Sequence, residues 1–160
     1  MLAAVLAGCD KGTEQTAIET TTSSTATVEE VDYAAAVKLD ETSGRAQIQL
    51  TQSGIKQFVD GDTTHFWVPS SVMHGGILKA RYLAVNTPES TGKIEEYGKK
   101  ASNFTKEKLS SAVSIVIESD TATWNPDSTG DRFLVWVWYK TADMEDYRCL
   151  NLEILQNGLA

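Results

Sequence analysis

From Gln47 onward, apolar and polar residues alternate over short segments, which is typical of strands that bury one face. The alternation predicts strands at 47–50, 55–58, 63–68, 77–85, 113–118 and 132–139. Residues 93–111 instead repeat apolar side chains at helical spacing, in a stripe of Ile94, Tyr97, Ala101 and Phe104. A short second helix is predicted to start at an N-cap, Asn151, and to end at Gly158. Several short strands around one main helix predict a small α+β barrel, of which the OB fold is one type.

The first 45 residues follow a different pattern. An apolar run of nine residues ends in Leu6-Ala7-Gly8-Cys9, which resembles the lipobox of bacterial lipoproteins and implies that Cys9 carries lipid. A frayed apolar N-terminus is the alternative. The segment that follows is rich in Thr, Ser, Glu and Ala, and has too few large apolar side chains to offset the entropy of ordering. We therefore predict a signal remnant at 1–9, a flexible tether with its lead-in at 10–45, and one folded domain at 46–160.

The distribution of charge along the chain says more about possible partners than the total charge does. The 160-residue chain has a formal net charge of −8, which at first sight argues against a nucleic-acid partner. However, residues 10–44 hold eight acids against two lysines, so residues 45–160 are nearly balanced, with fourteen acids and twelve bases. A balanced domain neither supports nor excludes a polyanionic substrate, because a local patch of positive charge is enough.

The candidate chemistry lies at the two ends of the segment 58–90. The first end carries Asp60-Gly61-Asp62, a tight-turn signal between strand-forming residues. The second end is a strand with Arg81 that runs into a turn with Asn86 and Glu89. If the two strands pair, these oxygen-bearing side chains converge at one rim beside the guanidinium. Hard oxygen ligands next to an arginine suit a divalent cation and a phosphate together.

The same residues carry a resemblance to a known family. Several sequence motifs stand in the same order and at the same spacing as in that family. They are the Asp-Gly-Asp-Thr turn at 60–63, Arg81-Tyr82-Leu83-Ala84-Val85-Asn86-Thr87-Pro88-Glu89, Tyr97-Gly98-Lys99-Lys100-Ala101-Ser102-Asn103-Phe104, the Asp131-Arg132 turn and Asn157-Gly158-Leu159-Ala160. Over residues 46–160 the chain resembles the staphylococcal nuclease (thermonuclease) family. One such turn alone would be weak support, whereas several in register are strong.

This resemblance implies a five-stranded OB-like barrel and a calcium-dependent enzyme that hydrolyses phosphodiester bonds in DNA and RNA. It places calcium on Asp62, Asn86 and the backbone carbonyl of Thr87, and catalysis on Arg81, Glu89 and Arg132. We further expect a monomer on the extracellular face of a bacterial membrane, held only by its lipid anchor, or secreted. The chain departs from the family in having asparagine at 86, where an aspartate is usual, and in stopping before the family's last helix.

Each site residue also has an ordinary structural interpretation. Asp60 and Asp62 can shape a turn, Glu89 can flank the coming helix, and Arg132 can pair with Asp127 or Asp131 in its own loop. A non-catalytic nucleic-acid or ligand-binding module on the same barrel therefore remains the alternative function.

The remaining reactive or aromatic side chains are assigned to structure. Cys149 is predicted to be a buried thiol, and His65 and His74 to be a strand-face and a loop histidine. Trp136 and Trp138 share one strand face and are predicted to cover or fill the barrel.

Overall fold

A computed structural model describes residues 29–90 and 97–160, and Val31–Ala160 form one compact unit. The predictions for Cys9 and for the signal remnant at 1–9 lie outside the described residues, as does most of the predicted tether. The same holds for the segment 91–96, which contains Ile94 and the predicted start of the main helix.

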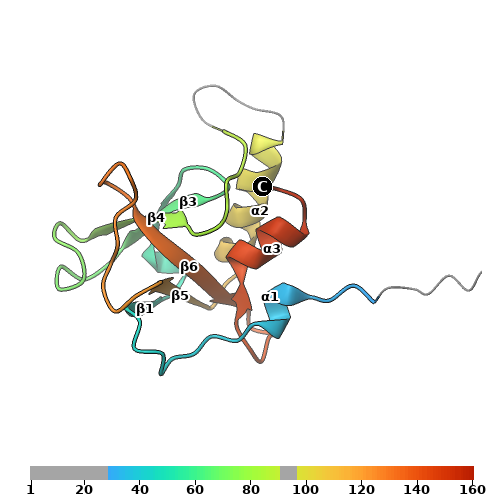
Figure 1. The fold of residues 1–160 in the computed structure, drawn as a ribbon, viewed down its shortest axis with the longest axis horizontal. Coiled ribbons are helices and arrows are strands. Elements are labelled where there is room, and N and C mark those ends of the chain that lie inside the picture. The colour runs from blue at the N-terminus through green and yellow to red at the C-terminus, as the bar shows by residue number, and fades with distance from the viewer. Residues whose placement is uncertain (1–28, 91–96) are drawn as a thin grey trace, which may run out of the picture. The chain divides into compact units, whose positions relative to one another are not determined.

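One mixed sheet forms the centre of the unit (Figure 1). Within the described residues it contains β1 (Gln47–Leu50), β2 (Ile55–Phe58), β3 (Thr63–Trp67), β4 (Ile77–Tyr82), β5 (Ser114–Ser119), β6 (Phe133–Lys140) and β7 (Arg148–Cys149). The strand order is β1-β5-β6-β4-β3-β2, with β7 paired to β6. Only the β4–β6 pair among these is parallel. The predicted α+β, barrel-like class is confirmed, although the sheet has seven strands where five were expected.

The helices lie beside this sheet (Figure 1). They are α1 (Tyr33–Ala36), α2 (Gly98–Ser110) and α3 (Leu150–Gln156), and a 3₁₀ turn, η1 (Gln52–Gly54), links β1 to β2. The alternating side chains of β3 to β6 that point inward pack against α2 and α3. This core contains Phe66, Leu78, Ala80, Tyr82, Ile115, Ile117, Val135, Val137, Tyr139, Ala101, Leu109, Leu150 and Ile154. It holds the two ends of the segment 58–90 on neighbouring strands.

The main helix differs from its prediction at its N-terminal end. Tyr97 is the N-cap residue, with a φ of 66° and an exposed side chain, so its predicted place in the buried stripe is wrong. The buried residues of α2 are Gly98, Ala101, Thr105 and Leu109. At the first residue of the helix, Gly98 packs directly on the backbone of Glu89, where a Cβ atom would collide with a carbonyl oxygen.

Two further boundaries were predicted wrongly. The strand expected at 77–85 ends at Tyr82, because Ala84 adopts a left-handed turn with a φ of 61°. The N-cap of α3 is Cys149, and Asn151 lies inside the helix. Its side chain is fully buried because it bonds to the backbone of β6 and of the turn after β4.

A second, smaller apolar cluster covers the outer side of the sheet. Val116, Trp138 and Cys149 are buried there, and Trp136 and Leu39 pack against them. The prediction that the two tryptophans cover the barrel is confirmed. Burial raises the pKa of the Cys149 thiol to about 11, in keeping with the predicted inert thiol.

Candidate active site

Asp62 is the buried centre of the rim that the sequence predicts. It lies between the turn after β2 and the start of β3, and its side chain is almost fully buried. Its Oδ2 accepts a hydrogen bond of 2.7 Å from the backbone N–H of Thr87, and its Oδ1 accepts one of 3.0 Å from the Thr63 hydroxyl. These donors favour the ionised carboxylate despite its burial.

Arg81 joins Asp62 to Asn86. Because β3 and β4 are antiparallel, Arg81 lies opposite Thr63, next to the buried carboxylate. Its guanidinium forms an ion pair with Asp62 Oδ1 and donates a hydrogen bond of 2.9 Å to Asn86 Oδ1. One planar fork therefore connects the two side chains that were predicted to hold the metal.

The turn at Gly61 is held by α2. A Cβ atom at Gly61 would lie 2.7 Å from Ala101 Cβ and 2.8 Å from the side chain of Thr87, so only glycine fits without displacing them. Thr105 of α2 donates a hydrogen bond of 2.6 Å from its hydroxyl to the carbonyl of Gly61. The helix thus fixes the Asp-Gly-Asp turn against the segment that carries Asn86 and Thr87.

Arg132 and Glu89 lie around this centre. Arg132 directly precedes β6, which runs parallel to β4 with Phe133 opposite Ala80. Its Nε donates a hydrogen bond of 2.7 Å to Asp127 Oδ2, the loop-closing pair that the sequence left open. Glu89 has an exposed side chain, and its negative charge acts on the Arg81 guanidinium. Both residues therefore contribute charge to the rim.

Asp60 is a further member of the rim that sequence reasoning treated only as a turn residue. Its carboxyl is buried, and this burial raises its pKa, while the positive charges of Arg81 and Arg132 oppose the rise. Burial lowers the pKa of Arg81, and the nearby charge of Arg132 adds to that effect. Two buried carboxyls and two arginines thus act on one another, as charged groups commonly do at functional sites. The repeated aspartate in Asp-Gly-Asp was the signal available in the sequence.

The donor set at the rim fits a hard cation such as calcium. Asp62, Asn86 and Thr87 offer only oxygen, and the Thr87 hydroxyl oxygen is buried without a hydrogen-bond partner in the described structure. Within residues 29–90 and 97–160 there is no cluster of three His, Cys, Asp or Glu side chains suited to a metal. The guanidinium of Arg81 contacts both Asp62 and Asn86, so a cation bound by the same two oxygens would have to displace it.

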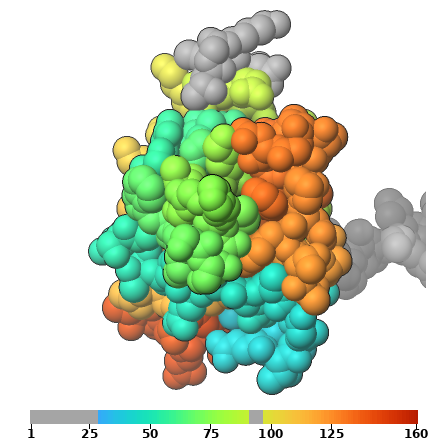
Figure 2. All heavy atoms as spheres, turned by 90° about the vertical axis from the view of Figure 1, so that its left-hand side faces the viewer, coloured from blue at the N-terminus to red at the C-terminus, as the bar shows by residue number. Residues whose placement is uncertain are grey.

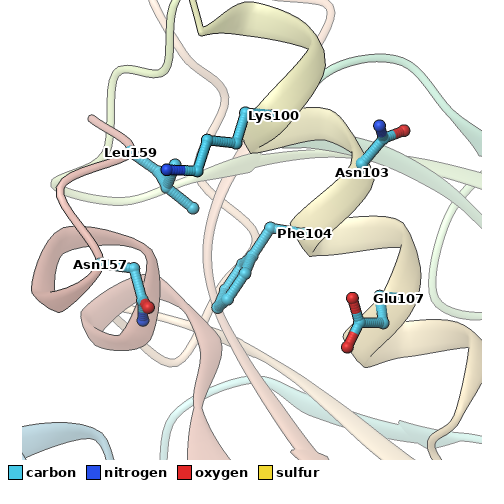
Figure 3. Close-up of a pocket in the computed structure, with 6 residues that line it drawn as sticks. All are labelled: Lys100, Asn103, Phe104, Glu107, Asn157 and Leu159. Carbon is cyan, nitrogen blue, oxygen red and sulfur yellow. The ribbon is translucent and has the colours of Figure 1, made fainter.

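A separate groove of about 500 Å³ lies between α2 and the end of the chain (Figure 3). The Phe104 ring extends from α2 toward Asn157 and Leu159, with Lys100 on the same side. None of the predicted site residues lines this groove, so it is not part of the rim.

Comparison with protein-family models settles the family. The model described as staphylococcal nuclease homologue matches residues 79–160. The chain belongs to this family. The match includes Arg81, Asn86, Thr87, Glu89 and Arg132, whereas Asp62 precedes it and reaches the same rim through the pairing of β3 with β4. A search of curated proteins found no match.

Proposed function

We propose that this chain is a calcium-dependent nuclease that hydrolyses phosphodiester bonds in DNA and RNA. The observation that carries the proposal is the single rim on which Asp62, Arg81 and Asn86 are in direct contact. It lies within a domain of the staphylococcal nuclease family, which supports a nucleic-acid substrate. We further propose that the protein acts as a monomer outside the cell, anchored through lipid on Cys9 or secreted. Among the described residues, no helix is both long enough and apolar enough to cross a membrane.

The charges of the rim match the needs of this reaction. Attack on a phosphodiester gathers negative charge on the phosphate oxygens, which fixed guanidinium groups stabilise. Arg81 and Arg132 supply two such groups, and Glu89 is an exposed carboxylate able to orient or deprotonate a water. Calcium held by Asp62, Asn86 and Thr87 would supply a Lewis acid that polarises a phosphate oxygen. Arg81 is then free to turn from its two intramolecular partners to the substrate.

Cleavage is expected to require calcium. The test is to incubate the protein with single-stranded DNA, duplex DNA and RNA, in calcium and in excess chelator, and to follow the products on gels. We expect all three substrates to be degraded in calcium and none in chelator, because the candidate metal ligands are all oxygens, which calcium prefers. Undiminished cleavage in chelator would contradict the metal dependence. Tight binding without any cleavage would support the non-catalytic alternative.

Asn86→Asp is expected to tighten calcium binding by about 10- to 100-fold, which is about 1.4–2.8 kcal/mol. The substitution adds a full negative charge at the position of the Asn86 oxygen, and Coulomb attraction at ~4 Å is about 4 kcal/mol before desolvation and repulsion from Asp62 reduce it. Calorimetric titration of calcium into the parent and the variant, without substrate, measures the difference. Superimposable titrations would show that position 86 does not hold the metal.

A further inference from the structure

The outward face of β2, β3 and β4 continues from Arg81 along the sheet. The inward residues of β3 and β4 are buried, whereas Lys79, His65 and Trp67 lie on the other face. The register places His65 opposite Lys79 and Trp67 opposite Ile77, while Arg81 lies opposite Thr63. From Arg81 to Trp67 this face spans four residues of strand, which is ~13 Å. We call Lys56, His65, Trp67 and Lys79 the strand-face track.

The track is positively charged and carries one exposed aromatic ring. The Lys56 ammonium lies 5.3 Å from the centre of the Trp67 ring, and half of the Trp67 side chain remains exposed. Lys79 pairs with the exposed Asp131, so part of its charge is compensated. Partial burial lowers the pKa of His65, and the nearby charges of Lys79 and Lys56 lower it further, which places both lysines close to this ring.

A groove borders the track. It has a volume of about 370 Å³ and is lined by residues of the β3–β4 connection and of the loop before β6, including His74, Lys79, Asp131 and Phe133. Figure 2 shows these two segments side by side, with the β3–β4 hairpin in green and the loop before β6 in orange. Arg132 lies between Asp131 and Phe133 in the sequence, and both of these residues line the groove beside Lys79.

We propose that the strand-face track binds a stretch of single-stranded nucleic acid that continues from the phosphodiester held at Arg81. The inference rests on the proposed nuclease function, because that function places the cleaved phosphodiester at Arg81 and so fixes one end of the bound strand. Lys56 and Lys79 contact phosphates, and Trp67 stacks on a base. Base stacking on aromatic rings beside a positively charged groove is the general way in which proteins bind single strands.

Charge complementarity identifies the occupant. Residues 45–160, which contain the track, are nearly balanced in charge, with fourteen acids and twelve bases, so the two lysines form a local positive patch that favours a polyanion. Lys79 and Arg81 lie on the same face of β4, and Lys56 lies beside the exposed Trp67 ring on the neighbouring strands. A stacked strand at ~3.4 Å per nucleotide covers the ~13 Å from Arg81 to Trp67 with about four nucleotides. In a duplex the bases are paired and stacked inside the helix, so Trp67 has no base face to stack on.

The test measures binding without cleavage. A fluorescein-labelled thymidine oligonucleotide of about 12 nucleotides is titrated with protein in excess chelator, and its anisotropy gives the dissociation constant. We expect Trp67→Ala to weaken binding by about 5- to 100-fold, the effect of removing one stacking ring. Lys56→Gln and Lys79→Gln should each reduce the salt dependence of log K by about 0.7, the value for one lost phosphate contact.

Two control variants match these changes elsewhere on the surface. Tyr33→Ala removes an exposed ring from α1, and Lys106→Gln removes an exposed charge from α2. Both should bind like the parent, and melting curves show whether all variants remain folded. Parent-like binding by Trp67→Ala, or equal affinity for a duplex of the same length, would overturn the inference.

The experiment separates this inference from the proposed function. If the protein cleaves in calcium but the track variants bind the oligonucleotide like the parent, the binding role of the track is contradicted and the nuclease function is supported. If binding depends on Trp67 and the two lysines but no cleavage occurs in calcium, the binding role of the track is supported and the nuclease function is contradicted. If both hold, Trp67→Ala should slow the cleavage of long single strands more than the cleavage of a dinucleotide, because a dinucleotide held at Arg81 does not reach Trp67.

Discussion

Arg81→Lys is expected to slow phosphodiester hydrolysis at saturating calcium by about 30- to 1000-fold, which corresponds to about 2–4 kcal/mol in the barrier. Lysine keeps the positive charge but not the planar fork. In the structure that fork contacts Asp62 and Asn86 with two different nitrogens, which a single ammonium does not reproduce. The same fork is the group available to hold two phosphate oxygens at once. Initial rates of single-strand cleavage by the parent and the variant measure the loss.

Arg148→Lys is the matched control for this change. Arg148 also uses two guanidinium nitrogens, which donate to the carboxylate of Asp32 at 2.8 and 3.0 Å, but it contacts none of the rim residues. Arg148 also lies 3.6 Å from the carboxylate of Glu153, another residue outside the rim. The replacement of Arg148 should leave the cleavage rate unchanged within about twofold, because none of its partners belongs to the rim. An Arg81→Lys variant as active as the Arg148→Lys variant would remove Arg81 from the reaction.

Asn151→Ala is expected to lower the free energy of unfolding by about 3–5 kcal/mol. The Asn151 side chain is fully buried, and its Oδ1 accepts a hydrogen bond of 2.9 Å from the N–H of Val137. Its amide donates to the carbonyls of Leu83 and Val135 at 2.9 and 3.0 Å. Alanine removes all three bonds and leaves the Val137 N–H without a partner in the core, which adds a desolvation cost to the lost bonds. Urea unfolding followed by circular dichroism measures the change.

Asn157→Ala serves as the comparison for the Asn151 variant. Asn157 is the C-cap residue of α3, its amide donates a hydrogen bond of 2.8 Å to the carbonyl of Glu153, and the residue is exposed. We expect this variant to lose about 1 kcal/mol or less. Equal losses for the two asparagines would show that the bonds from Asn151 to β6 and to the turn after β4 do not stabilise the fold as described.

Local pattern in the sequence was enough to predict the rim's framework. The alternation of apolar residues predicted β3 and β4. In the structure these strands pair antiparallel, which brings Arg81 next to Asp62. Such predictions succeed because the period of a strand and the chemistry of a turn are properties of neighbouring residues. The pattern also predicted a strand beginning at Arg132, whereas only the family resemblance assigned Arg132 to the site.

The features that the sequence did not predict depend on contacts between distant segments. Asparagine is a common N-cap residue, but Asn151 lies inside α3. Its side chain bonds to β6 and to the turn after β4 instead of capping the helix. At the start of α2 the backbone of Glu89 packs against Gly98, a contact that no helical period reveals. The interaction of Asp60 with two arginines arises only when the sheet has formed. In each case a tertiary contact overrides a local preference.

The central claim is that the rim around Asp62 and Arg81 hydrolyses phosphodiester bonds with calcium. The most direct measurement is the initial rate of single-stranded DNA cleavage by the parent and by Arg81→Lys in calcium, then in excess chelator, and then after calcium is restored. We expect rapid cleavage by the parent that stops in chelator and resumes with calcium, and cleavage by the variant that is at least about 30-fold slower. A parent that is inactive in calcium, or two proteins that cleave at the same rate, would contradict the claim.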